Sequence, residues 1–369
     1  MDSFKYPPSQ RAIIIGTGDK VHIQDNIELP QLQTGEFLIR TDAVAVNPSD
    51  TKMRGDFVTV GGILGTDYAG TVVALGPQVE SVHIGDRVCG AQNAMNAKSP
   101  LRGSFAEYNI SAGKVWLKLH ASLSTEGGAT LGAGISTAGL GIKLLQLPLP
   151  DAPVDKSAYV LVYGGSTATA TIAIQLLRLA NLTPVVTCSP KNTARMKELG
   201  AEESFDYHDP DCASKIRSYT KNNLRYALDC ITTVESTMCC FAAIGRAGGR
   251  YVSLDPFAEH AASRATVKTD WVLGPSIFGD GSTWPAPYGR PPSEEIRAYG
   301  ERLWNIAQKL VDEGKLQHHP VRVLEGGLNG IHAGLDLVRS GKLSGEKCVV
   351  RFGKHPSVLN APRTQSDCP

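Results

Sequence analysis

Two glycines and three hydroxyl residues follow an apolar segment in the stretch Gly164-Gly165-Ser166-Thr167-Ala168-Thr169. Residues 158–163 favour a strand, and residues 170–177 have the composition of a helix. A strand, a tight turn and a helix N-terminus bind anions, because free N–H groups and the helix dipole both favour negative charge. The pattern G-x-G-x-x-G fails at Ser166 and Thr169, but the context predicts a cofactor phosphate site. A plain helix cap is the alternative.

The end of the next expected strand indicates which cofactor binds. Cys188 is followed by Ser189-Pro190-Lys191-Asn192, and no acidic residue occurs before Glu198. Enzymes that use NAD usually place an acid here for the ribose hydroxyls. A hydroxyl and a cation suit a 2′-phosphate instead, so the sequence favours NADPH over NADH. Ser189 as a helix cap and Lys191 as a solvated side chain remain compatible with this interpretation.

The same turn partly matches the nucleophile elbow G-x-S-x-G of serine hydrolases. Gly164-Gly165-Ser166-Thr167-Ala168 lacks the final glycine of that motif. A hydrolase would also need an acid and a histidine on later loops. The available histidines, such as His260 and His332, lie in no suggestive motif. A serine hydrolase using Ser166 is therefore the less favoured alternative.

A second group of polar residues follows an apolar segment at residues 47–55. Its sequence is Asn47-Pro48-Ser49-Asp50-Thr51-Lys52-Met53-Arg54-Gly55. An amide, a carboxylate, hydroxyls and cations are thus gathered in one turn. Taken alone, these residues indicate only a capped helical turn with a solvated lysine.

Composition narrows the class of protein. The chain has 369 residues, a net charge of +1, 42% hydrophobic residues and 20% charged residues, which is ordinary for a globular protein with two domains. The near-zero charge argues against nucleic acid or an anionic membrane as partner. No apolar run approaches the ~20 residues of a membrane span. The eight cysteines show no C-x-x-C spacing, which favours reduced thiols in the cytoplasm.

Two domains of different secondary structure must position these residues. Residues 11–120 contain short apolar runs broken by glycine and proline, which predicts a small β-barrel-like domain. From residue 158 strands and helices alternate, which predicts a doubly wound parallel sheet. Residues 274–293 are rich in glycine and proline and favour an irregular loop. Residues 294–313 form an amphipathic helix in this interpretation, and the last strands are expected to return to the first domain.

Several longer motifs make the chain similar to a known group of enzymes. They are Asn47-Pro48-Ser49-Asp50 with Arg54-Gly55, Gly65-Thr66-Asp67-Tyr68-Ala69-Gly70, Gly85-Asp86-Arg87-Val88, residues 133–140, 163–170 and 279–290, and Leu343-Ser344-Gly345-Glu346-Lys347. Together they resemble the zinc-free medium-chain dehydrogenase/reductase superfamily. Within it the chain is similar to the trans-acting enoyl reductases of fungal polyketide synthases. The resemblance covers nearly the whole chain.

The resemblance implies an α/β fold with a doubly wound parallel Rossmann sheet and a GroES-like β-barrel catalytic domain. Residues 1–150 and 300–369 would form the catalytic and substrate domain, and residues 151–299 the NADPH-binding domain. Gly65-Thr66-Asp67 stands where zinc alcohol dehydrogenases carry Gly-His-Glu. Residues 92–97 replace their four-cysteine lobe, so neither zinc site is expected.

The resemblance also implies roles for individual residues. Such enzymes transfer hydride from NADPH to the β-carbon of an α,β-unsaturated thioester. Lys52 and Thr137 are the candidate catalytic residues, the first for the proton or the enolate and the second for the thioester. The candidate cofactor residues are Ser49, Asp50, Thr51, Lys52, Ser166, Thr167, Ala168, Thr169, Ser189, Pro190, Lys191, Asn192, Tyr207, Leu254, Asp255, Val349 and Val350. The candidate substrate residues are Ala138, Gly139, Leu140, Gly141, Ile142, Lys143, Leu144, Leu145, Ser276, Ile277, Phe278, Gly279 and Asp280.

The implied partner is a polyketide synthase or a hybrid polyketide synthase–peptide synthetase. Its acyl carrier domain would present the enoyl substrate on phosphopantetheine. A zinc-free NADPH-dependent quinone or enone reductase acting on free small molecules remains an alternative, as does a cofactor-binding sensor without activity. Nothing in the sequence marks a dimer interface, so a monomer is expected.

Overall fold

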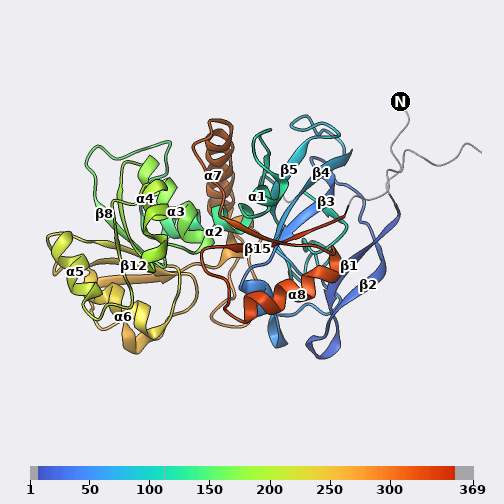
Figure 1. Cartoon of the computed structure of the whole chain (residues 1–369). Coiled ribbons are helices and arrows are strands. Elements are labelled where there is room, and N and C mark those ends of the chain that lie inside the picture. The colour runs from blue at the N-terminus through green and yellow to red at the C-terminus, as the bar shows by residue number, and fades with distance from the viewer. Residues whose placement is uncertain (1–6, 112, 354–369) are drawn as a thin grey trace, which may run out of the picture.

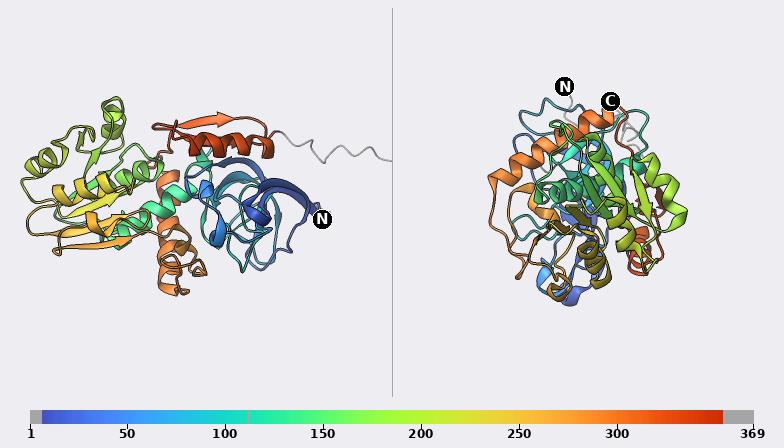
Figure 2. Two further views of the ribbon diagram at one scale, coloured as in Figure 1. Left: turned by 90° about the horizontal axis from the view of Figure 1, so that it is seen from below. Right: turned by 90° about the vertical axis from the view of Figure 1, so that its left-hand side faces the viewer.

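The chain folds into two lobes, with helices α2 and α7 between them (Figure 1). The structure is a computed structural model, which describes residues 7–111 and 113–353. Figure 2 shows the strands β1–β5 in one lobe and the helices α3–α6 in the other. No helix in these described ranges is long and apolar enough to cross a membrane.

The first lobe is built around a seven-stranded sheet. Its strands are β3 (Phe37–Ala45), β4 (Asp67–Leu75), β5 (Arg87–Ala91), β6 (Tyr108–Ile110), β7 (Trp116–Lys118), β14 (Val321–Leu324) and β15 (Lys347–Arg351). Six of them follow the order β14-β15-β3-β4-β5-β7, and β6 pairs with β3. A separate antiparallel pair is formed by β1 (Ser9–Ile15) and β2 (Val21–Glu28). The antiparallel pairing of β15 with β3 confirms that the last strands return to the first lobe.

The second lobe contains a six-stranded sheet that is parallel throughout. Its strands are β8 (Tyr159–Tyr163), β9 (Thr183–Thr187), β10 (Glu203–Phe205), β11 (Tyr226–Asp229), β12 (Gly249–Ser253) and β13 (Val267–Trp271), in the order β10-β9-β8-β11-β12-β13. Its helices are α3 (Ala168–Leu179), α4 (Thr193–Glu198), α5 (Cys212–Tyr219) and α6 (Val234–Ala243). The predicted doubly wound Rossmann sheet is confirmed.

Alternation along β8 explains why helices cover both faces of this sheet. Val160 and Val162 belong to a buried cluster with Ile172 of α3. Leu161 and Tyr163 belong to another cluster, which contains residues of α5 and α6. Successive side chains of a strand point to opposite faces, and here both faces are apolar.

The remaining helices join or flank the lobes. They are α1 (Thr125–Ala129), α2 (Gly132–Leu144), α7 (Glu294–Asp312) and α8 (Leu328–Arg339). Helix α1 is capped at its N-terminus, since the Ser124 side chain accepts a hydrogen bond from the Gly127 N–H at 2.9 Å. Helix α7 matches the amphipathic helix predicted for residues 294–313. The expected domain boundary between residues 299 and 300 falls inside α7, so a division there would cut one continuous helix.

Short 3₁₀ helices occupy several turns. They are η1 (Thr17–Asp19), η2 (Ser49–Thr51), η3 (Gly55–Phe57), η4 (Pro190–Asn192), η5 (Glu259–Ala261) and η6 (Gly274–Phe278). The last of these corrects the expectation of an irregular loop over residues 274–293 for residues 274–278, whereas residues 279–293 contain no helix or strand. Pro275 stands in the first turn of η6, where its fixed φ and missing N–H are tolerated. Gly279 then ends η6 with a φ of 75°, which favours glycine.

Candidate active site between the two lobes

The glycine turn joins the end of β8 to the start of α3. The Gly164 N–H donates to Thr187 Oγ1 at 2.9 Å and the Gly165 N–H to the Thr187 carbonyl at 2.8 Å. A Cβ on Gly165 would lie 2.9 Å from Val186 Cβ, so only glycine lets the turn approach β9 this closely. Thr167 caps α3 by accepting from the Ala170 N–H at 3.2 Å. Residues 166–169 are half-buried, and the first N–H groups of α3 have no intrahelical acceptor.

The end of β9 carries a second polar group beside this turn. The hydroxyls of Ser189 and Tyr207 lie 3.3 Å apart. Ser189 makes no capping hydrogen bond, so its hydroxyl is not engaged by the start of η4. Lys191 and Pro190 are exposed in η4. The Nδ2 atom of Asn192 is buried and has no hydrogen-bond partner within the described part of the chain.

Lys52 and Asp255 form an ion pair that links the two lobes. Lys52 follows η2 of the first lobe, and Asp255 follows β12 of the second lobe. Lys52 Nζ lies 2.6 Å from Asp255 Oδ2. The Tyr288 hydroxyl donates to the other carboxylate oxygen at 3.0 Å. No role for Tyr288 was predicted from the sequence, although it lies in the 279–290 motif.

The surroundings of Tyr288 are aromatic. Its ring centre lies 5.0 Å from that of Trp271 and 5.1 Å from that of Phe57. Burial, followed by the nearby Asp255 carboxylate, raises the pKa of Tyr288 to about 12. Tyr288 therefore stays a neutral hydrogen-bond donor to Asp255 at neutral pH.

Asp50 points into the protein rather than towards the space between the lobes. Its carboxylate accepts the Asn47 N–H at 2.7 Å and the Thr66 hydroxyl at 3.1 Å. Burial raises the pKa of Asp50 to about 7, and the nearby Asp67 carboxylate adds to the shift. Ser49, Thr51 and Lys52 are at least partly exposed, so these three of the four candidates in the turn can reach a ligand directly.

A buried ion pair lies directly behind this turn. Lys347 Nζ bonds to Asp67 Oδ2, and both side chains are almost fully buried. Asn47 Nδ2 also donates to Asp67 Oδ2, at 3.0 Å. Both charged residues lie in motifs noted in the sequence, but they were not paired there because they are far apart in the chain. The ranges 7–111 and 113–353 contain no group of three or more His, Cys, Asp or Glu side chains arranged to hold a metal.

Thr137 lies on α2, close to the start of η6. It is half-buried, and its Oγ1 atom lies 3.8 Å from the position that a Cβ on Gly274 would take. The candidate substrate residues 138–145 continue α2, but most of them are packed into the core. Gly139 contacts Leu303 of α7, and Lys143 pairs with Glu295 at 2.7 Å. The structure therefore brings Thr137 to η6 and places the following turns of α2 against α7.

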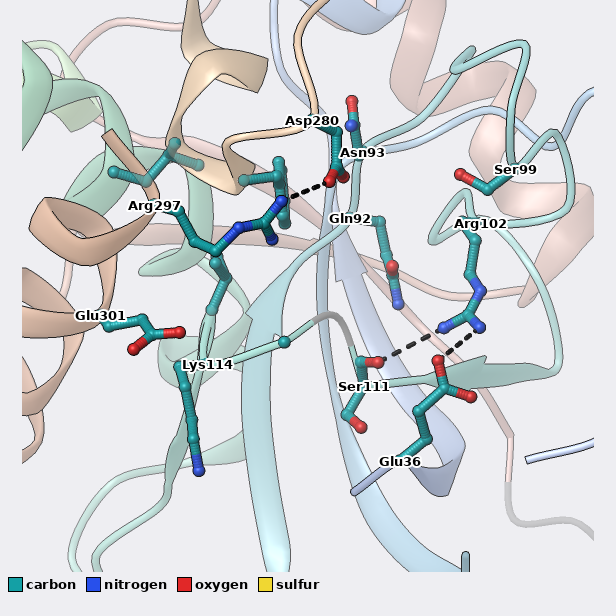
Figure 3. Close-up of a pocket in the computed structure, with 14 residues that line it drawn as sticks. Glu36, Gln92, Asn93, Ser99, Arg102, Ser111, Lys114, Asp280, Arg297 and Glu301 are labelled. Carbon is teal, nitrogen blue, oxygen red and sulfur yellow. Dashed lines mark hydrogen bonds and ion pairs between the residues drawn. The ribbon is translucent and has the colours of Figure 1, made fainter. Parts of the chain in front are cut away.

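The loop candidates lie beside a cavity of about 240 Å³ (Figure 3). Ile277, Phe278 and Asp280 line it, and Ser276 and Gly279 are their neighbours in the chain. Asp280 is held by Arg297 of α7 at 2.9 Å. Gln92 and Asn93, which follow β5, also line the cavity. The sequence assigned these two residues no role of their own. They belong to residues 92–97, which replace the four-cysteine lobe of zinc alcohol dehydrogenases.

The remaining cofactor candidates differ in how deeply their side chains are buried. Leu254 is half-buried between β12 and Asp255, and its N–H donates to the Thr232 hydroxyl at 3.1 Å. The side chains of Val349 and Val350 are fully buried in β15, in two different apolar clusters. Through their side chains, these two valines stabilise the first lobe.

Comparison with known proteins shows the family. Residues 33–121 match the alcohol dehydrogenase GroES-like domain. The chain is 58% identical over 352 residues to the lovastatin nonaketide synthase enoyl reductase component lovC of Aspergillus terreus, which covers 94% of this chain and 97% of that protein. It is 58% identical over 357 residues to the dehydrogenase mokE of Monascus pilosus, covering 95% and 99%. It is 43% identical over 349 residues to the trans-enoyl reductase buaC of Petromyces alliaceus, covering 94% and 98%.

The chain belongs to the trans-enoyl reductase family. The crystal structure of CurK enoyl reductase has the same fold, with a TM-score of 0.73, 18% identity and coverage of 93% of this chain and 99% of that chain. Trans-enoyl reductases are medium-chain dehydrogenases/reductases, a group that implies a nicotinamide cofactor. The residues present fit such a group: an open helix N-terminus at Thr167, the paired hydroxyls of Ser189 and Tyr207, and the orphaned amide of Asn192 all adjoin one edge of the parallel sheet.

Proposed function

We propose that this chain is an NADPH-dependent enoyl reductase that acts in trans on an α,β-unsaturated thioester presented by a polyketide synthase. The observation that carries the proposal is the ion pair from Lys52 to Asp255. It brings a cation of the first lobe to the edge of the Rossmann sheet where the glycine turn and Ser189 also lie. In open α/β sheets this edge, at the carboxyl ends of the strands, is where ligands bind.

The cofactor would be held by residues of both lobes. Ser166, Thr167, Ala168 and Thr169 would bind the diphosphate at the start of α3, and Ser189 and Lys191 would bind the 2′-phosphate. Asn192, Pro190 and Tyr207 would adjoin the adenosine, and Ser49, Thr51, Leu254 and Asp255 the rest of the cofactor. When bound, NADPH would supply the hydride that the alkene requires.

Lys52 and Thr137 would act on the substrate. Negative charge develops on the thioester oxygen during reduction, and a preorganised donor beside it lowers the barrier. Thr137 would donate its hydroxyl proton in a hydrogen bond to that oxygen. Lys52 carries an ammonium held by Asp255, so it can stabilise the same charge or deliver the proton to the α-carbon.

The partner would be the acyl carrier domain of a polyketide synthase or hybrid synthase, as the names of the relatives suggest. We place the reaction in the cytoplasm, because the seven cysteines of the described residues are all free thiols. A monomer is sufficient for this proposal, since both lobes of the site come from one chain.

The proposal is tested by following NADPH absorbance with a crotonyl thioester while free thiol is measured in parallel. We expect NADPH consumption without thiol release. Lys52→Ala should lower kcat/KM by about a hundredfold or more, the usual effect of removing one such donor. Lys156→Ala, a change at an exposed lysine, is the matched control and should leave the rate unchanged.

Three results would contradict this function. Release of thiol without NADPH consumption would indicate a hydrolase that uses Ser166. Binding of NADPH without its oxidation by any enoyl thioester would indicate a sensor. Preference for a free quinone or enone over every thioester would indicate a reductase of free small molecules.

A further inference from the structure

The cavity between the β5 end and η6 carries two buried amide atoms with no protein partner. Gln92 Oε1 and Asn93 Nδ2 both lack a hydrogen-bond partner within the described ranges, and the two residues are only 2% and 7% exposed. One is an acceptor and the other a donor. Buried polar atoms without partners are costly, so a pair of them on two residues that line one cavity points to a ligand.

The orientation of Gln92 is fixed by the protein. Its Nε2 donates to Asn109 Oδ1 at 3.1 Å and to the Ile110 carbonyl at 2.8 Å. Both partners are acceptors, so rotating the amide would place an oxygen against two oxygens. In Figure 3 the Gln92 amide lies between the Arg297–Asp280 pair and the Arg102–Glu36 pair. Gln92 therefore offers an acceptor that only a donor from outside the protein can satisfy.

The cavity is lined by segments that are bonded or joined to both parts of the proposed active site. On one wall, the Gln92 N–H donates to the Thr66 carbonyl at 2.7 Å, and the Thr66 hydroxyl bonds to Asp50 in the Lys52 turn. On the other wall, η6 begins at Gly274 beside Thr137 and ends at Phe278 in the cavity. At a rise of about 2 Å per residue in a 3₁₀ helix, η6 spans about 8 Å.

We propose that this cavity binds the pantetheine arm of the thioester substrate, with Gln92 and Asn93 hydrogen-bonded to an amide of the arm. The inference rests on the proposed function, since the acyl group must lie near Thr137 and Lys52. The first amide of pantetheine follows the sulfur by an ethylene link and carries one N–H and one carbonyl. Gln92 Oε1 accepts the N–H, and Asn93 Nδ2 donates to a carbonyl.

The charges around the cavity fit a neutral ligand. Arg102 is paired with Glu36 at 2.7 Å and Arg297 with Asp280 at 2.9 Å, so two of the lining cations are already neutralised. Glu301 also lines the cavity. Lys114 lines it as well, so the lining holds three cations and three carboxylates and is formally neutral. A neutral diamide suits such a lining.

The test compares crotonyl thioesters of pantetheine and of ethanethiol, which differ only in the arm. We expect the wild-type chain, with NADPH, to show a kcat/KM ratio of pantetheine to ethyl thioester of about ten. Asn93→Ala and Gln92→Leu should each lower this ratio by about three- to tenfold, the usual effect of losing one hydrogen bond. Asn93 makes no side-chain bond with the other described residues, so Asn93→Ala avoids disturbing β5. Because the ratio compares two substrates on one sample, it does not depend on the folded fraction.

A binding measurement gives a second readout without turnover. S-methyl pantetheine titrated into the NADPH-loaded chain by calorimetry should bind more weakly to both variants than to the wild type. Asn96→Ala, a change in the same loop outside the cavity, is the matched control and should leave ratio and affinity unchanged. Equal use of both thioesters by the wild type, or a ratio unaffected by both variants, would overturn the inference. Failure to reduce either thioester would instead contradict the proposed function.

Discussion

Asp50 shows how one buried carboxyl group couples the active-site turn to pH. Burial raises its pKa in the folded chain to about 7, whereas an unfolded chain exposes the same group to water. The unfolded state therefore loses this proton at lower pH than the folded state. The stabilising contribution is fully present below pH ~4 and is lost as the pH rises through about 7.

We expect Asp50→Asn to remove the loss of stability that accompanies the rise in pH. Wild-type free energy of unfolding should fall between pH 5 and pH 8 by a few kcal/mol, at about 1.4 kcal/mol per pKa unit, and the variant should fall less. Urea unfolding at both pH values measures the difference. Asp25→Asn, at an exposed position, serves as control. If the Asp50→Asn variant kept the pH dependence of the wild type, the assigned pKa would be wrong.

Sequence alone could identify the chemistry of individual residues but not their partners. The hydroxyl of Ser189 and the cation of Lys191 follow a strand, and from that place the sequence predicts a 2′-phosphate site, which stays a prediction. The pairs Asp67–Lys347 and Asp255–Tyr288 were not, because nothing in local sequence tells which distant residue approaches a given carboxylate. Asp50 was assigned to the cofactor by its neighbours, and only the fold shows that its carboxylate points inwards.

At the scale of elements, glycine sets how closely α2 approaches α7. A Cβ on Gly139 would lie 2.1 Å from Leu303 Cδ2, and the Tyr299 hydroxyl donates to the Gly139 carbonyl at 2.7 Å. Leu303 is fully buried, so it cannot move into solvent. This contact fixes the helix that carries Thr137 and therefore the position of that hydroxyl.

We expect Gly139→Ala to lower the free energy of unfolding by about 1–3 kcal/mol, the usual cost of overpacking. Leu303→Ala alone should cost about 2–5 kcal/mol through the cavity that it leaves. In the double variant the added methyl group fills part of that cavity, so the combined loss should be smaller than the sum of the single losses. Additive losses in urea unfolding would show that the two residues do not interact.

Helices and strands were the most predictable part of the fold. Alternation of strands and helices from residue 158 follows directly from apolar periodicity, and α7 has one apolar face over its whole length. The first lobe was predicted as a small β-barrel-like domain to which the last strands return. The pairing of its strands was not predicted, because its sheet joins segments from both ends of the chain. The packing of residues 138–145 against α7 also depends on contacts between distant elements.

At the scale of the whole molecule, the candidate cofactor residues come from both lobes. They follow β8, β9, β10 and β12 in one lobe, and lie in or next to η2 and in β15 in the other. A ligand that binds only the folded chain stabilises it by about 2.7 kcal/mol at a concentration of 100 times its Kd. Cofactor binding should therefore stabilise both lobes together against unfolding.

We expect NADPH to raise the Tm more than NADH at equal concentration. The difference should shrink in Lys191→Ala, because the lysine would pair with the 2′-phosphate that NADH lacks. Thermal unfolding with each cofactor measures both shifts, and Lys156→Ala is a control at another exposed lysine. Equal shifts with NADPH and NADH in the wild type would contradict the assignment of Ser189 and Lys191.

The pairing of β15 with β3 has a consequence for synthesis on the ribosome. Val349 lies opposite Ala45, and β15 pairs only with residues 43–45 of β3, so these residues have no partner on that side until β15 has been made. Asp67 likewise cannot form its ion pair until Lys347 has been synthesised, and before that no cation offsets the burial of its carboxylate. The Rossmann lobe, whose strands span residues 159–271, can fold while the first lobe is still unfinished. The lobe that is translated first is thus completed last, and a nascent chain stalled before β14 would expose an open sheet edge to aggregation.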